Sequence, residues 1–84
     1  TTMEELSPDP EIKLYPNPVH EMLTVRSGSG ISSICIYDLR GSILLTIEGS
    51  GNEVSVDMSP MKPGIYIVRI FTREGSFPRR IIKE

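Results

Sequence analysis

The chain lacks most of the residues from which catalytic and metal sites are built. Its 84 residues include one histidine, one cysteine and no tryptophan or alanine. A single cysteine excludes an internal disulfide framework, and His20 is the only imidazole that could activate a serine nucleophile. The carboxylates are not grouped with His or Cys at spacings that bind zinc or calcium. We therefore predict no enzymatic activity, no metal site and no cofactor.

Long apolar segments are also absent. The longest apolar runs, such as residues 65–68, have four residues, whereas a membrane-spanning helix needs about 20. The sequence therefore predicts no membrane span, and nothing near Thr1 resembles a signal peptide. The chain is expected to be either cytoplasmic or a piece of a longer exported protein. Five aromatic residues and a net charge of -2 make a nucleic-acid partner unexpected.

Glycine and proline divide the sequence into short apolar segments, separated by turn signals about every 8 to 12 residues. Most segments show period-2 alternation, and none has the spacing of an amphipathic helix. The pattern predicts an all-β, immunoglobulin-like sandwich of about seven antiparallel strands. The predicted strands are 12–15, 21–26, 31–37, 42–48, 53–58, 65–72 and 77–83.

The alternation also predicts which side chains form the core. Residues 64–72 are apolar on both faces apart from Arg69, which favours a central strand. Cys35 is expected to be a buried thiol, and residues 27–30 are expected to form a hairpin turn. In the segment 42–48, Ile43, Leu45 and Ile47 are expected to share one face. The predicted core is Leu23, Val25, Ile34, Ile36, Leu45, Val54, Val56, Tyr66, Val68 and Ile70.

Charge and composition divide the chain unevenly. Residues 1–10 are rich in acids and prolines and poor in apolar residues, so we expect a flexible linker from an upstream domain there and one folded domain over 11–84. Residues 1–57 carry nine acids against three bases, whereas residues 58–84 carry six bases against two acids. The basic end is either a solvated face or a docking surface for an acidic partner.

Several motifs follow one another in a characteristic order. Residues 14–18 read Leu-Tyr-Pro-Asn-Pro, residues 36–41 read Ile-Tyr-Asp-Leu-Arg-Gly, and residues 61–70 read Met-Lys-Pro-Gly-Ile-Tyr-Ile-Val-Arg-Ile. Together they resemble the C-terminal sorting domain of the type IX secretion system over about residues 12–84. The chain departs from the family at Glu21, where Asp is frequent, and at Glu84, where many members stop at lysine. The motif residues are Tyr15, Pro16, Asn17, Pro18, Tyr37, Asp38, Gly41, Gly64 and Tyr66.

These motif residues also have structural reasons to be present. The prolines stiffen the entry to the domain, Asp38 and Gly41 suit a tight turn, and Gly64 begins the central strand. Tyr66 is expected to bury its ring while its hydroxyl finds a backbone partner.

The resemblance implies a non-catalytic address. Family members direct an upstream cargo through the periplasm to the outer-membrane translocon, and a sortase-like peptidase often removes the domain, leaving the cargo on the cell surface or secreted. The alternative is an adhesive or carbohydrate-binding accessory module. A terminal edge strand also permits pairing between two chains, although the sequence does not fix the oligomeric state.

We predict that the translocation machinery recognises the basic carboxyl-terminal strand. Its backbone and arginines would contact the partner, and its two isoleucines would pack against it. The predicted recognition residues are Arg79, Arg80, Ile81, Ile82, Lys83 and Glu84.

Overall fold

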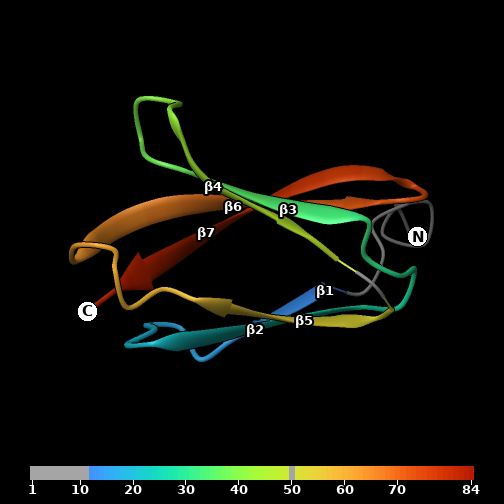
Figure 1. Ribbon diagram of the computed structural model, residues 1–84, viewed down its shortest axis with the longest axis horizontal. Coiled ribbons are helices and arrows are strands. Elements are labelled where there is room, and N and C mark those ends of the chain that lie inside the picture. The colour runs from blue at the N-terminus through green and yellow to red at the C-terminus, as the bar shows by residue number, and fades with distance from the viewer. Residues whose placement is uncertain (1–11, 50) are drawn as a thin grey trace, which may run out of the picture.

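The computed structural model describes residues 12–49 and 51–84, so the linker predicted at 1–10 lies outside the described residues. Within them, seven strands and no helix form two antiparallel sheets, as Figure 1 shows. This arrangement confirms the all-β sandwich. The strands are β1 (Ile12–Tyr15), β2 (Met22–Ser27), β3 (Ser33–Tyr37), β4 (Ile43–Glu48), β5 (Glu53–Asp57), β6 (Gly64–Thr72) and β7 (Gly75–Lys83).

The two sheets face each other as layers. One has the order β1-β2-β5 and the other the order β4-β3-β6-β7. The strand β6 lies between β3 and β7, which confirms that it is internal. In constant-type immunoglobulin domains the fourth strand joins the first sheet, whereas here β4 pairs with β3. The edges of the four-stranded sheet are therefore β4 and β7.

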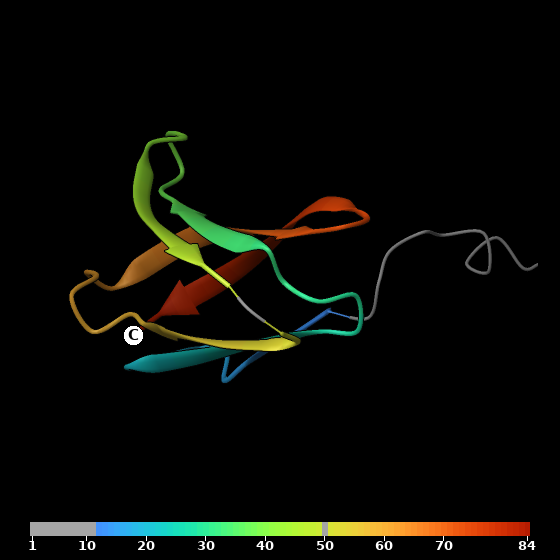
Figure 2. The ribbon, with the colours of Figure 1, turned by 45° about the vertical axis from the view of Figure 1, so that its right-hand side comes forward.

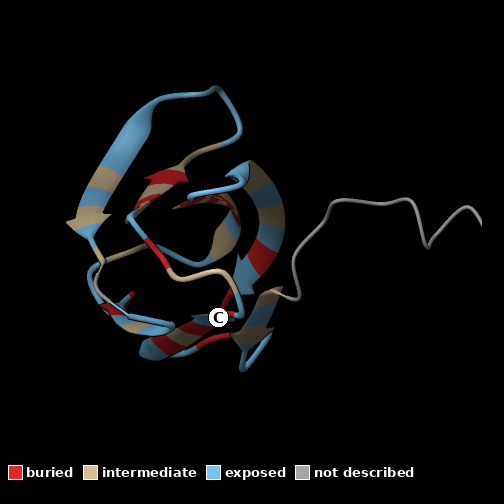
Figure 3. Ribbon diagram, turned by 90° about the vertical axis from the view of Figure 1, so that its right-hand side faces the viewer, coloured by how far each residue is buried: buried red, intermediate tan, exposed pale blue. Residues whose placement is uncertain are grey.

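Buried side chains fill the space between the layers. Figure 3 shows that buried positions alternate along the strands with less buried ones. Eight of the ten predicted core residues are buried, whereas Leu45 and Val54 are only partly buried against the core. Four further apolar residues are buried although the predicted core did not include them: three lie in connections between strands and one lies near the end of β7. These are Val19, Ile31, Met58 and Ile81.

The predicted face of β4 is wrong at its first residue. Ile36 lies opposite Leu45 while Tyr37 lies opposite Ile43, so Leu44 is an extra residue in the ladder. One extra residue inverts the alternation. Ile43 is consequently 60% exposed. Figure 2 shows the β3–β4 hairpin extending away from the three-stranded sheet.

Two further expectations are corrected by the connection from β2 to β3. Residues 27–30 do not close a hairpin, because β2 and β3 belong to different sheets. The strand β3 begins at Ser33 rather than at Ile31, whose side chain is buried instead. Cys35 is half-buried rather than buried, and its Sγ lies 3.8 Å from the Thr46 hydroxyl oxygen.

We expect truncation inside the sandwich to be far more costly than truncation on its surface. Ile70 is fully buried, and Ile70→Ala should lower the free energy of unfolding by about 2–5 kcal/mol. The same change at Ile65, on the same strand but 41% exposed, should cost less than about 1 kcal/mol. Urea denaturation of both variants measures the difference, and equal losses would contradict this core.

Candidate functional site

The carboxyl-terminal strand presents only part of the predicted recognition segment to solvent. Arg80, Ile82 and Glu84 are exposed, whereas Ile81 and Lys83 are buried. Arg79 is half-buried. Successive side chains of a strand point to opposite faces, so the inward set packs within the domain and the outward set faces solvent. Ile81 is 1% exposed and therefore packs inside the folded domain rather than against another protein.

Lys83 was predicted to contact a partner, but its side chain is buried. It is 7% exposed, and its Nζ donates a hydrogen bond to the Glu84 carbonyl oxygen at 3.1 Å. A lysine can bury its aliphatic stem while its ammonium group keeps a polar partner. In the folded domain this side chain therefore supports the end of β7 from inside.

The first motif and the last strand meet at this end of the sandwich. The Val19 N–H donates to the Ile82 carbonyl at 2.8 Å, and the Glu84 N–H donates to the Val19 carbonyl at 2.9 Å. The Ile82 N–H donates to Asn17 Oδ1 at 3.0 Å. Val19 is also fully buried. We call this contact of residues 17–19 with β7 the clasp.

The clasp covers the outer edge of β7 where a partner strand would otherwise pair. Peptide groups alternate in direction along an antiparallel strand, so those of Pro78 and Arg80 face outward like those of Ile82. Pro78 has no N–H to offer, and its carbonyl accepts from the Arg79 guanidinium at 2.9 Å. Within residues 12–49 and 51–84, the peptide groups of Arg80 alone remain without a partner on this part of the edge. Pairing of another strand with this part of β7 is therefore restricted.

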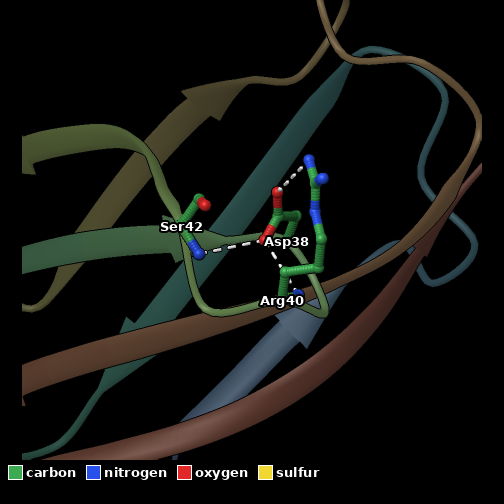
Figure 4. Close-up of polar contacts among 3 residues, drawn as sticks. All are labelled: Asp38, Arg40 and Ser42. Carbon is green, nitrogen blue, oxygen red and sulfur yellow. Dashed lines mark hydrogen bonds and ion pairs between the residues drawn. The ribbon is translucent and has the colours of Figure 1, made fainter.

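The middle motif builds a tight turn. Figure 4 shows Asp38 Oδ1 accepting hydrogen bonds from the N–H groups of Arg40 at 2.9 Å and Ser42 at 3.0 Å. Gly41 has a φ of 92°, a conformation that suits glycine. The tight turn predicted at Asp38 and Gly41 is therefore confirmed. The Ser42 N–H is the main cause that lowers the pKa of Asp38, with the Arg40 N–H and guanidinium acting in the same direction.

The remaining motif residues also have mainly structural environments. Gly64 begins β6, and the Tyr66 hydroxyl donates to the Lys62 carbonyl at 2.6 Å, as predicted. Both X-Pro bonds of the first motif are cis. Tyr37 differs from these residues, because it is half-buried on the outward side of β3 and lies opposite Ile67 of β6.

The single histidine lies beside one carboxylate in the part of the chain that the structure describes. His20 Nε2 lies 3.7 Å from Glu84 Oε1, and both side chains are largely exposed. Across the described positions, no group of three or more His, Cys, Asp or Glu side chains could hold a metal ion. The same part of the chain contains no helix long and apolar enough to cross a membrane.

Comparison with known protein families gives this geometry a context. The family model for the secretion system C-terminal sorting domain matches residues 13–84. The chain belongs to this family. A search of curated proteins found no match. The domain is thus a sorting signal for type IX secretion, whose cargo proteins are secreted or displayed at the outer-membrane surface.

In this sorting domain the motifs have separate structural positions. The first motif and the end of β7 meet in the clasp, whereas the Asp38 turn lies at the tip of the β3–β4 hairpin. No local pattern indicates that Asn17 and Val19 contact β7, because 65 positions separate Asn17 from Ile82. The clasp residues were therefore missed as a group, although Asn17 was recognised as a motif residue.

Loss of the clasp acceptor should loosen the end of β7. Asn17→Ala removes the partner of the Ile82 N–H, which should cost about 1 kcal/mol of stability and speed exchange of that amide about fivefold. Asn52→Ala is the matched control, because its side chain makes only a long 3.5 Å hydrogen bond to Gly28. Amide hydrogen exchange measures both variants, and an unchanged Ile82 rate in Asn17→Ala would contradict the clasp.

The turn carboxylates make a pH-dependent contribution to stability. Hydrogen bonds lower the pKa of Asp38, chiefly through the Ser42 N–H, and that of Asp57, chiefly through the Ser59 hydroxyl, below the ordinary 3.8. A lowered pKa in the folded state stabilises the domain above the ordinary value, and this contribution is lost as the pH falls through the folded value. Carboxyl NMR titration should give midpoints below 3.8 for both groups. Midpoints at or above that value would contradict these hydrogen bonds.

Proposed function

We propose that the sorting domain directs an upstream cargo protein through the periplasm to the outer-membrane translocon, and that a sortase-like peptidase then removes the domain. The family match over residues 13–84 carries this proposal. In it, residues 1–10 form the linker to the cargo and contain or adjoin the bond that the peptidase cleaves. The domain itself acts as an address and performs no chemistry.

We further propose that the machinery reads the domain in its folded state. The outward side chains Arg80, Ile82 and Glu84 supply the contact from β7, since Ile81 and Lys83 are buried. The inward residues and the clasp hold this strand in place. The predicted recognition segment therefore contains residues with two roles. Its outward side chains contact the machinery, and its inward side chains hold the strand in the domain.

The alternative of a carbohydrate-binding module gains little from the hollow between the loops, although the groove beside Tyr37 has one aromatic side chain. A hollow of about 640 Å³ lies between the loops, and none of its lining residues is aromatic. Sugar sites commonly place aromatic side chains against the ligand, and binding pockets in general are rich in them. The polar lining of this hollow gives no specific reason to prefer that function.

A reporter fusion tests the sorting function. An inert exported reporter joined to residues 1–84 should reach the surface or medium of a bacterium that has the type IX system, while the reporter alone should stay in the periplasm. Fractionation and surface protease accessibility measure the distribution. Equal distributions of the two proteins would overturn the sorting function.

Charge reversal tests recognition by β7. Arg80→Glu should reduce export of the fusion about fivefold or more, because charge complementarity governs association. Arg73→Glu changes the net charge equally at an exposed position outside the recognition segment, so export should be nearly normal. Deletion of residues 81–84 is a poorer test, because it also removes buried Ile81 and the clasp bonds. Normal export of a folded Arg80→Glu variant would contradict this role.

A further inference from the structure

The two sheets of the sandwich have outward faces of different character. On the three-stranded sheet, the outward positions of β2 and β5 carry Met22, Thr24, Arg26, Glu53, Ser55 and Asp57. The outward positions of β1 add Lys13 and Tyr15. This face is polar apart from Met22 and the ring of Tyr15, as expected for the solvated side of an antiparallel sheet. Its acids and bases are mixed, and Arg26 lies 3.4 Å from Glu53.

The four-stranded sheet is apolar where the other is polar. On its outward face Ile65 lies opposite Ile82, and the next row places Ile67 between Tyr37 and Arg80. Ile65 and Ile82 are 41% and 43% exposed. We call Tyr37, Ile65, Ile67, Arg69, Arg80 and Ile82 the outer patch.

Next to the outer patch, a groove extends toward the β3–β4 hairpin. This groove of about 520 Å³ lies beside Tyr37 and Ile67, and Asp38, Leu39, Gly41 and Arg69 also line it. Leu39 is 66% exposed. Single exposed apolar residues are common, but contiguous apolar surface of this kind marks an interaction site.

The fold does not require these apolar residues. Threonine in place of outward isoleucine would preserve strand propensity and would leave the core unchanged, because the core is formed by the inward set such as Tyr66, Val68 and Ile70. The sequence pattern of β6 predicted that both of its faces are buried. In the structure only the inward face is buried, and the apolar residues of the other face lie on the surface of the domain.

The charges of the outer patch indicate the chemistry of its partner. The outward positions of β3, β6 and β7 include two arginines, Arg69 and Arg80. Asp38 and Glu84 also border this face, but both carboxylates already have partners. Asp38 accepts from the Arg40 and Ser42 N–H groups, and Glu84 Oε1 lies 3.7 Å from His20 Nε2. Arg69 Nη1 donates to the Ser76 hydroxyl oxygen at 3.0 Å, which holds its guanidinium along the sheet. A surface that is apolar and positively charged is complemented by one that is apolar and carries carboxylates.

We propose that the outer patch is the docking surface for a protein partner whose contact area is apolar and carries carboxylates. The inference rests on the proposed sorting function, which makes this partner part of the export machinery. It extends recognition from β7 to β3 and β6. An anionic lipid surface is the less favoured occupant, because two arginines give little electrostatic attraction to a membrane, at about 1 kcal/mol each.

Export of the reporter fusion tests the apolar part of the outer patch. Ile65→Ser should reduce surface reporter about tenfold, since a central apolar contact is worth more than 1 kcal/mol. Met22→Ser is the matched control, because Met22 is 49% exposed on the opposite face. Arg69→Gln should reduce export severalfold, while Arg73→Gln should not. Thermal melting of each purified variant should stay close to that of the unchanged domain.

The outcomes separate the two proposals. Failure of the unchanged fusion to be exported would overturn the sorting function itself. Normal export of folded Ile65→Ser and Arg69→Gln variants would overturn the outer patch and leave the sorting function standing. A photo-crosslinking amino acid in place of Ile65 should give a protein adduct during export, whereas the same amino acid in place of Thr24 should not. A lipid or lipopolysaccharide adduct at position 65, or none, would contradict a protein partner.

Discussion

Three hydrogen bonds between residues 17–19 and the end of β7 close the sandwich at its carboxyl-terminal end. They join two parts of the chain that are 65 positions apart, and they bury Val19 at the same time. With this contact in place, β7 keeps Ile81 and Lys83 inside and directs Arg80 and Ile82 outward. The surface available to a partner is thus decided by how the last strand is held.

The clasp also covers part of the outer edge of β7. An edge strand with unpaired peptide groups invites pairing with other chains, and a secretion signal at a terminus is especially accessible. Here the clasp occupies the groups of Ile82 and Glu84, and Pro78 offers no donor. A partner is therefore more readily bound by side chains on the face of the sheet than by pairing one of its strands with β7. The two proposals agree on this point, since the outward residues of β7 form one border of the outer patch.

Sequence patterning predicted the parts of this structure that depend on local alternation. The seven strands, the internal position of β6 and the Asp38 turn followed from period-2 segments, apolar continuity and turn chemistry. The bulge at Leu44 could not be predicted, because it depends on how β4 pairs with β3. The clasp and the burial of Lys83 are long-range results of closing the sandwich. The apolar residues that β6 contributes to the outer patch are visible in the sequence. Their exposure is not, because it depends on whether another layer covers that face of the sheet.

We infer that the export machinery recognises the sorting domain while it is folded, with the clasp closed and the outer patch exposed. Amide hydrogen exchange of the reporter fusion bound to the purified outer-membrane translocation complex tests this most directly. The amides of Val19, Ile82 and Glu84 should stay as protected in the complex as in the free domain. Loss of their protection on binding would mean that the strand is released before it is recognised, and would contradict recognition of the folded domain.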